Sequence, residues 1–113
     1  MRSGVRIGRP TLVLHAALTP RGSGSAPAPD QIHVGFIVGK AVGNAVTRNR
    51  VRRRLRHLAA AQLRGTPGAV DVVVRALPRA ATAQEELRID VASAWSTALA
   101  RLGVPALDPA GVS

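Results

Sequence analysis

The sequence predicts an α/β (α+β) two-layer sandwich, in which helices cover one small mixed sheet. Three observations support this fold class. Apolar residues alternate in two segments as they do in strands and form a nearly continuous run in a third, they recur at helical spacing in two longer segments, and the order along the chain is strand, strand, helix, strand, helix. The 113 residues, 46% of them hydrophobic, suffice for one modest core. We expect a single domain over residues 1–113, with its core over about 8–103 and a frayed tail over 104–113.

Three segments are expected to form the sheet. Residues 11–18 alternate between two faces, residues 32–39 do the same, and residues 69–77 form a mostly apolar run. A bulge or break near residues 17–19 would divide the first strand, so the number of strands stays open by one. Residues 19–31 are rich in Pro, Gly, Ser and Ala, which is typical of a flexible hairpin loop. One face of the first strand carries Leu12, Leu14, Ala16 and Leu18, and one face of the second carries Ile32, Val34, Phe36 and Val38.

Two segments are expected to be helices. Residues 44–64 carry a narrow apolar stripe, and Gly65 and Pro67 end the segment. The second helix is expected to begin at Thr82 through a capping box with Glu85, and to stop at Gly103. The stripe of the first helix consists of Val51, Leu55, Leu58 and Ala59, and that of the second consists of Leu87, Val91, Ala94, Trp95, Ala98, Leu99 and Leu102. Because Trp95 lies on the apolar stripe, we expect it in the core rather than stacked on a nucleic-acid base.

The charge is unevenly distributed along the chain. Residues 1–64 contain twelve Arg or Lys and a single acid, Asp30, whereas residues 65–113 contain four Arg and five acids. Fifteen of the sixteen cations are Arg, whose guanidinium forks suit bidentate contacts to phosphate. A dense charge of one sign indicates a polyanionic partner.

The most informative segment runs from Lys40 to Arg56, with seven cations and no acid. Gly39 and Gly43 are expected to let the chain turn from strand into helix, which places Asn44 and the free N–H groups of the first helical turn where a phosphate can bind. At helical spacing, one ridge consists of Arg48, Arg52 and Arg56, and another of Arg50 and Arg54, with Arg53 between them.

No catalytic centre is recognisable in the chain. The three histidines, at positions 15, 33 and 57, lack metal-ligand spacing, and the chain contains no Cys. Of the acids outside the basic segment, Glu85 is explained as a helix cap and Glu86 as a solvated first-turn charge. We therefore expect no catalytic residue and no metal bound by the protein alone. The chain shows neither a secretory signal nor an apolar run of the about 18–20 residues that span a bilayer, so we expect a cytoplasmic protein without membrane contact.

The segment Lys40–Arg56 resembles the "RNR" signature of the bacterial ribonuclease P protein component. It contains Gly43-Asn44-Ala45-Val46, Arg48-Asn49-Arg50 and Arg53-Arg54-Leu55-Arg56, and residues 34–38 and 72–78 resemble the flanking strands of that family. The similarity covers about residues 8–102. The resemblance implies the family fold, which includes a left-handed βαβ crossover where general rules favour the right-handed one.

The resemblance also implies a function. Members of the family are small basic subunits that bind a large catalytic RNA, and the holoenzyme removes the 5′ leader from precursor transfer RNA. The catalytic RNA supplies the Mg²⁺-dependent active site, so Mg²⁺ is expected to be held mainly by the RNA. The residues implied in RNA binding are Lys40, Asn44, Arg48, Asn49, Arg50, Arg52, Arg53, Arg54 and Arg56. Those implied in a cleft for the single-stranded leader are Val13, His15 and Phe36, where His15 either stacks on a base or is a passive surface group.

The chain departs from the family pattern in two places. The family usually has a further basic stretch and helix before the first strand, whereas Met1 stands nearly at that strand, either because the start lies upstream or because part of the leader site is missing. Ala41 also stands where a second Lys often follows the first.

Two other functions stay open, a general RNA chaperone or ribosome-associated protein and a DNA-binding protein. With one Phe, one Trp and no Tyr, and with Arg on several helix faces, a folded RNA is favoured over single strands or DNA.

Overall fold

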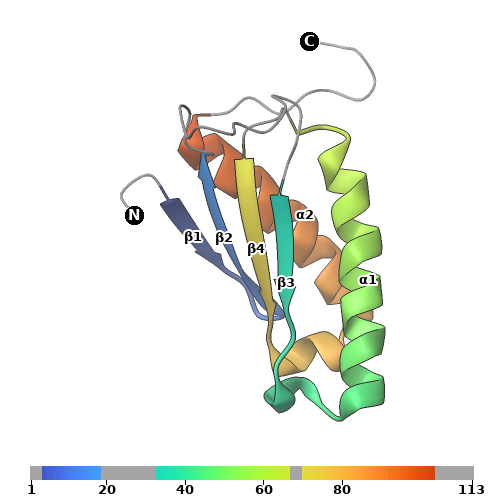
Figure 1. The fold of residues 1–113 in the computed structure, drawn as a ribbon. Coiled ribbons are helices and arrows are strands. Elements are labelled where there is room, and N and C mark those ends of the chain that lie inside the picture. The colour runs from blue at the N-terminus through green and yellow to red at the C-terminus, as the bar shows by residue number, and fades with distance from the viewer. Residues whose placement is uncertain (1–3, 19–32, 67–69, 104–113) are drawn as a thin grey trace, which may run out of the picture.

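The computed structural model describes residues 4–18, 33–66 and 70–103, and these residues form a four-stranded sheet with two long helices (Figure 1). The strands stand in the order β1–β2–β4–β3. Their bounds are β1 Gly4–Gly8, β2 Leu12–Leu18, β3 His33–Ile37 and β4 Val70–Ala76. The helices are α1 Ala45–Leu63 and α2 Gln84–Leu102, with short 3₁₀ turns η1 Lys40–Val42 and η2 Pro78–Ala81. The expected loop over 19–31 and the tail over 104–113 lie outside the described residues.

The sheet is mixed, as predicted. β2 pairs antiparallel with both β1 and β4, whereas β3 lies parallel to β4. β3 and β4 are therefore the parallel neighbours that need a crossover connection, and α1 provides it. The chain thus forms the mixed α+β sandwich that the order of its elements predicts.

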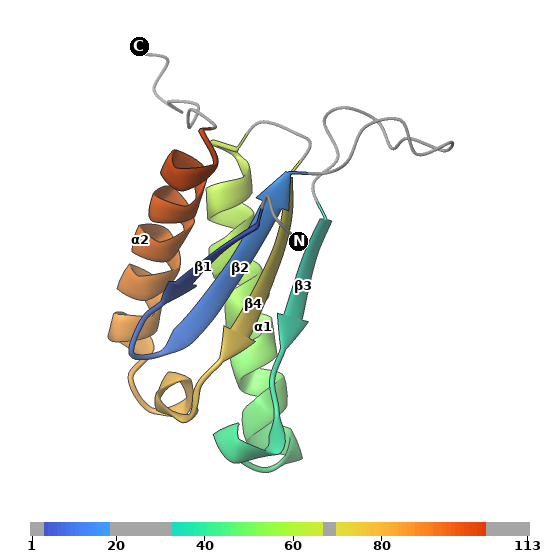
Figure 2. The same ribbon diagram turned by 90° about the vertical axis from the view of Figure 1, so that its left-hand side faces the viewer.

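Both helices cover the same face of the sheet, and the opposite face carries no helix in the described part of the chain (Figure 2). α2 packs on β1 and β2, while α1 packs beside α2. The predicted apolar stripes are confirmed: Val51, Leu55 and Ala59 of α1 are buried, and so are all stripe residues of α2 except Leu102, which is partly buried. The sheet contributes Ile7, Leu12, Leu14, Ala16, Val70, Val72, Val74 and Ala76 to this core.

β1 is a strand that the hydrophobic pattern does not predict. Its five residues, Gly-Val-Arg-Ile-Gly, contain only two apolar side chains, which is too little for a periodicity to appear. Ile7 is nevertheless buried, and β1 forms a hairpin with β2. The additional strand therefore precedes β2, and β2 itself runs unbroken to Leu18, whose side chain is 41% exposed at the strand end.

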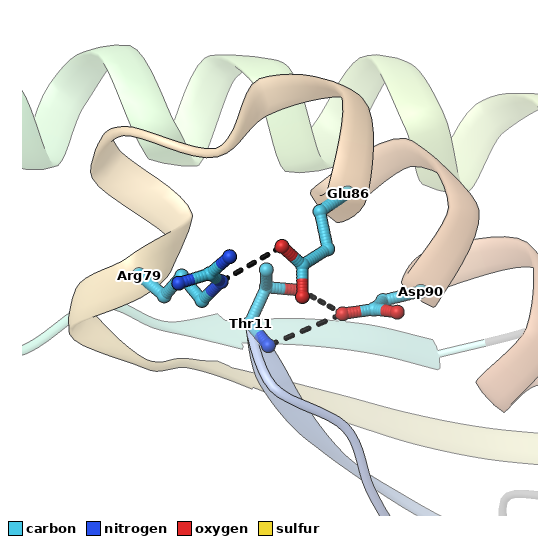
Figure 3. A network of polar contacts seen from close by, with 4 residues as sticks. All are labelled: Thr11, Arg79, Glu86 and Asp90. Carbon is cyan, nitrogen blue, oxygen red and sulfur yellow. Dashed lines mark hydrogen bonds and ion pairs between the residues drawn. The ribbon is translucent and has the colours of Figure 1, made fainter.

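The predicted capping box at Thr82 is wrong. The chain first forms η2, and Thr82 ends that turn, so α2 begins two residues later with Ala83 at the N-cap and no side-chain cap. Glu85 does not cap the helix, and instead accepts hydrogen bonds from Arg88. Glu86 is not a free solvated charge, because Arg79 of η2 donates to it at 2.7 Å (Figure 3). The C-terminal prediction is confirmed, since Gly103 caps α2 in the left-handed conformation.

A buried carboxylate fixes the turn between β1 and β2 to α2. Asp90, 6% exposed, accepts hydrogen bonds from the backbone N–H of Thr11 at 3.2 Å and from its hydroxyl at 2.7 Å (Figure 3). In the same turn, Arg9 donates to Ser93 at 2.9 Å and to Thr97 at 3.3 Å. Each buried donor of Thr11 thus has a hydrogen-bond partner, as burial requires. Because all these bonds join the turn to α2, they orient the sheet on that helix.

Candidate nucleic-acid interface

The passage from β3 into α1 depends on one glycine. Gly43 has φ of +154°, and a Cβ there would lie 2.8 Å from Thr47 Cγ2, which is far closer than a real contact allows. Gly39, which the sequence also predicts as a turn residue, has an extended backbone with φ of −87°, and a Cβ added to it would meet no atom within 4 Å. The turn therefore requires glycine at position 43 and not at position 39.

Gly43→Ala is expected to lower the free energy of unfolding by about 1–3 kcal/mol, because alanine is strained at this φ and collides with Thr47. Gly39→Ala is the matched control and should stay within about 0.5 kcal/mol of the parent. Urea unfolding followed by circular dichroism measures both. Equal losses for the two variants would contradict the assigned backbone role.

Asn44 is the N-cap of α1. Its Oδ1 accepts a hydrogen bond from the N–H of Thr47 at 2.9 Å, so the helix itself satisfies one first-turn donor. The first turn contains no acid, and the side chain of Val46 is 66% exposed there. The predicted phosphate-binding N-terminus therefore keeps a positive end, although the Asn44 oxygen is already used within the helix.

Around α1, the arginines flank the buried stripe on both sides. Helical spacing places Arg48, Arg52 and Arg56 on one flank, and Arg50, Arg53 and Arg54 on the other. Arg52 donates to Asn49 Oδ1 at 3.1 Å. Among the described residues, none of these six arginines forms an ion pair. The Nε atoms of Arg48 and Arg54 are buried and have no acceptor within the described part of the chain. A helix with this many uncompensated guanidinium groups fits a polyanion.

The open face of the sheet presents a second polar surface. The strand register places Arg6, His15, Val73 and Gly35 in one row across the four strands, and Gly8, Val13, Arg75 and Ile37 in the next. The side chain of Ile37 is 48% exposed. A shallow hollow of about 400 Å³ lies over β1, β2 and β4, and its lining includes Arg6, His15 and Val73. Arg6 and Arg75 are not among the predicted site residues. The sequence does contain a signal for Arg75, because it lies two residues after Val73 and therefore on the same face of β4.

The proposed grouping of Phe36 with Val13 and His15 is wrong. Phe36 pairs with Val74, which pairs with Leu14, and this row belongs to the helix-covered face. Phe36 packs against the core there, whereas Val13 and His15 lie on the open face. Because successive side chains of a strand point to opposite sides, the three residues cannot line one cleft on the sheet.

The remaining histidines lie apart from each other, and only His33 contacts an acid among the described residues. His33 lies at the edge strand and contacts Asp71 Oδ1 at 3.0 Å, and His57 lies on α1. In the ranges 4–18, 33–66 and 70–103, no three His, Asp or Glu side chains lie close enough to hold a metal ion. The same ranges contain no helix long and apolar enough to cross a membrane.

Fold and site together define a basic α+β domain of the nucleic-acid-binding class, with a guanidinium-lined helix next to an open sheet face. The family model for ribonuclease P matches residues 1–99. The ribonuclease P protein component of Kocuria rhizophila is 52% identical over 102 residues, which cover 89% of this chain and 83% of the relative. That of Salinispora tropica is 44% identical and covers 91% and 85%. The chain belongs to the ribonuclease P protein family.

Solved structures agree with the fold. The RNase P protein from Thermotoga maritima superposes with a TM-score of 0.63 at 18% identity, covering 81% of each chain. The RNase P protein from Staphylococcus aureus gives a TM-score of 0.59 at 21% identity, covering 86% of this chain and 79% of that one. The chain thus shares the fold of these two RNase P proteins.

Proposed function

We propose that this chain binds the catalytic RNA of ribonuclease P through α1 and helps the holoenzyme remove the 5′ leader of precursor transfer RNA. The family membership supports the assignment to this enzyme. The observation that carries the RNA contact is α1 itself, in which six arginines flank one buried stripe and none is paired with an acid of the described residues.

The open sheet face is the surface that we assign to the single-stranded leader. Arg6 and Arg75 provide charges for phosphates, while Val13 and Ile37 provide apolar contact area in the row of Arg75. His15 lies beside Arg6 across the β1–β2 pair, where an imidazole ring can stack on a base. Phe36 has no part in this surface, because it packs against the core.

The residues of the RNA-binding helix do not fit a Mg²⁺ site. Mg²⁺ prefers several oxygen ligands, with carboxylates among them, and α1 contains no acid. Its asparagine oxygens are engaged, since Asn44 accepts from Thr47 and Asn49 accepts from Arg52. We therefore assign Mg²⁺ and the bond-breaking step to the RNA, and assign to the protein the binding and orientation of RNA in the cytoplasm.

Reconstitution tests the proposal. The catalytic RNA should cleave a precursor transfer RNA more efficiently at low Mg²⁺ when this protein is present, and the protein without RNA should not cleave. If about six to ten phosphates are contacted, affinity for the RNA should fall about 10³–10⁵-fold between 50 and 200 mM salt. Cleavage by the protein alone, or equal stimulation of an unrelated ribozyme, would favour a different function. Tighter binding to duplex DNA than to the catalytic RNA would favour the DNA-binding alternative.

A further inference from the structure

β3 forms one edge of the sheet, and its outer side has no partner strand in the described part of the chain (Figure 2). Within those residues β3 pairs with β4 alone, and no backbone hydrogen bond joins residues 33–37 to a turn or loop. In a strand with one neighbour, alternate residues direct their N–H and C=O groups outward. β3 contains neither Lys nor Pro, the residues that commonly block such an edge. The outer side of β3 is therefore an open row of backbone donors and acceptors.

The apolar side chains of β3 are incompletely covered. Val34 and Phe36 lie on the helix-covered face, yet both are only partly buried, whereas their β4 partners Val72 and Val74 are fully buried. On the open face, about half of the side chain of Ile37 is exposed. A further strand beside β3 would cover these side chains, so it would gain apolar burial in addition to backbone hydrogen bonds.

The opposite edge of the sheet, formed by β1, differs in both respects. Arg6 stands on the open face of β1, and a charged side chain is a usual protection of an edge strand. On the covered face Ile7 is already buried, so an added strand would gain less apolar burial there. Of the two edges, β3 is therefore the one that fits another strand.

The charge next to β3 selects the kind of strand. α2 packs on β1 and β2, and α1 lies on the covered face next to β3 (Figure 1, Figure 2). Arg50 and Arg54 line a hollow together with Gln84 of α2, so their flank of α1 faces α2. The opposite flank, with Arg52 and Arg56, then faces the side beyond β3. Because neither arginine forms an ion pair with a described residue, a strand added to β3 would lie next to uncompensated positive charge.

We propose that the outer edge of β3 binds an acidic peptide segment of a protein partner as a fifth strand of the sheet. The peptide backbone pairs with the outward N–H and C=O groups of β3, and its Glu or Asp side chains on the covered face bind Arg52 and Arg56. A nucleic-acid backbone can bind these guanidinium groups, but it lacks the alternating N–H and C=O groups that pair along an edge strand. The inference goes beyond the proposed function and does not rest on it, because it concerns a protein partner.

The first experiment uses the synthetic peptide acetyl-Thr-Glu-Val-Glu-Val-Glu-Thr-amide, titrated into the full chain. Amide hydrogen exchange is followed by NMR at each residue, with and without the peptide. Within residues 33–37, the alternate amides that point outward should exchange at least about tenfold more slowly in the complex. The amides of β1 are the internal control, and their exchange should not change. The same peptide with Lys in place of each Glu should bind at least about tenfold more weakly.

N-methylation of the peptide separates backbone pairing from charge. One version carries methyl groups on the backbone nitrogens of the Glu residues, and the other carries them on those of the Val residues. Because alternate residues of a strand point to opposite edges, only one of the two versions blocks the N–H groups that face β3. That version should bind at least about tenfold more weakly, and the other should bind like the unmodified peptide, although both keep every acidic charge.

Two double variants test the contribution of α1. Arg52→Gln with Arg56→Gln should weaken peptide binding about tenfold in 0.15 M salt, where exposed charges farther apart than about 8 Å are largely screened. Arg50→Gln with Arg54→Gln is the matched control, because it removes the same charge from the flank that faces α2, and it should change the affinity less than about threefold. Circular dichroism checks that each variant is folded.

Three results would each overturn the proposal. The first is unchanged exchange of the β3 amides at saturating peptide. The second is equal affinity of the two methylated peptides, which would mean that no backbone pairing occurs. The third is an equal loss for the two double variants, which would reduce the binding to the net charge of the chain. None of these measurements contains RNA, so their failure would leave the proposed function intact.

Discussion

Replacing Arg48, Arg50 and Arg53 together by Ala should weaken binding of the catalytic RNA about a hundredfold near physiological salt. This magnitude follows from counterion release, since three lost phosphate contacts lower the salt slope by about three. The three residues cover both flanks of α1 and have no ion-pair partner in the described part of the chain, so their loss removes RNA contacts and not folded-state bonds. Filter binding at several salt concentrations measures both the affinity and the slope.

A charge-matched control separates specific contacts from net charge. Arg79, Arg88 and Arg101 are exposed and lie outside α1, so the corresponding triple alanine variant removes the same net charge from other surfaces. It also removes the exposed ion pairs of Arg79 with Glu86 and of Arg88 with Glu85, so circular dichroism must show that it is folded. It should lose far less affinity, and its salt slope should stay close to that of the parent. Equal losses for the two variants would show that the total charge of the chain, and not α1, holds the RNA. A loss of the circular-dichroism signal in the first variant would make the three arginines structural.

Trp95→Ala is expected to lower the free energy of unfolding by about 3–5 kcal/mol, a large part of the stability of a small domain. The side chain is 2% exposed and fills the space between α2 and the rest of the core. Its Nε1–H also donates to Thr66 Oγ1 at 2.9 Å, and the Thr66 hydroxyl donates to the carbonyl of Gln62 at 2.8 Å. The indole therefore connects α2 to the end of α1 as well as filling the core.

Trp95→Phe is the control for the packing contribution. It keeps an aromatic ring in the core but removes the donor, so its loss should be clearly smaller, near the about 1–3 kcal/mol of an unmade buried hydrogen bond. Urea unfolding followed by far-ultraviolet circular dichroism suits both variants, because the only tryptophan is the residue replaced. An alanine variant as stable as the parent would show that the indole does not hold the helices together.

The arginine variant and the Trp95 variants together distinguish a loss of RNA contacts from a loss of folding. We expect α1 to bind RNA only while its apolar stripe is packed in the core. Its inner stripe packs against α2 and belongs to the same core as the buried sheet residues, and this packing leaves the arginines on the two flanks of the stripe. In a destabilised variant, RNA binding should decrease only in proportion to the unfolded fraction. The triple arginine variant should lose affinity while fully folded, so the two kinds of damage are distinguishable in one set of measurements.

Local patterns in the sequence predict much of this molecule. The alternation in β2, the apolar run of β4, the two helical stripes and the burial of Trp95 follow from the local side-chain pattern alone. The basic segment over residues 40–56 similarly predicts α1 and its two arginine ridges, because charge and spacing are properties of neighbouring residues. The family is predicted from the resemblance of this motif to a known signature, and the family model confirms it.

Other features depend on contacts between segments far apart in the chain. β1 exists because Ile7 is buried beneath α2 and its strand pairs with β2, although its own sequence has almost no pattern. Phe36 lies on the helix-covered face because its register with Val74 places it there. Alternation within a strand shows which residues share a face, but it does not show which face the helices cover. α2 begins after Thr82 because η2 occupies the preceding residues and ends there.

The contact between α1 and α2 also depends on distant segments, since Arg54 and Gln84 line the same hollow. Arg54 and Gln84 are thirty residues apart, and no local spacing connects them. Periodicity places Arg54 on a flank of its helix, but the packing of that helix against α2 places the flank beside the uncapped helix start. Side-chain pattern is a short-range property, so it determines the faces of each element. The burial of apolar area between elements is long-range, and it selects which faces meet.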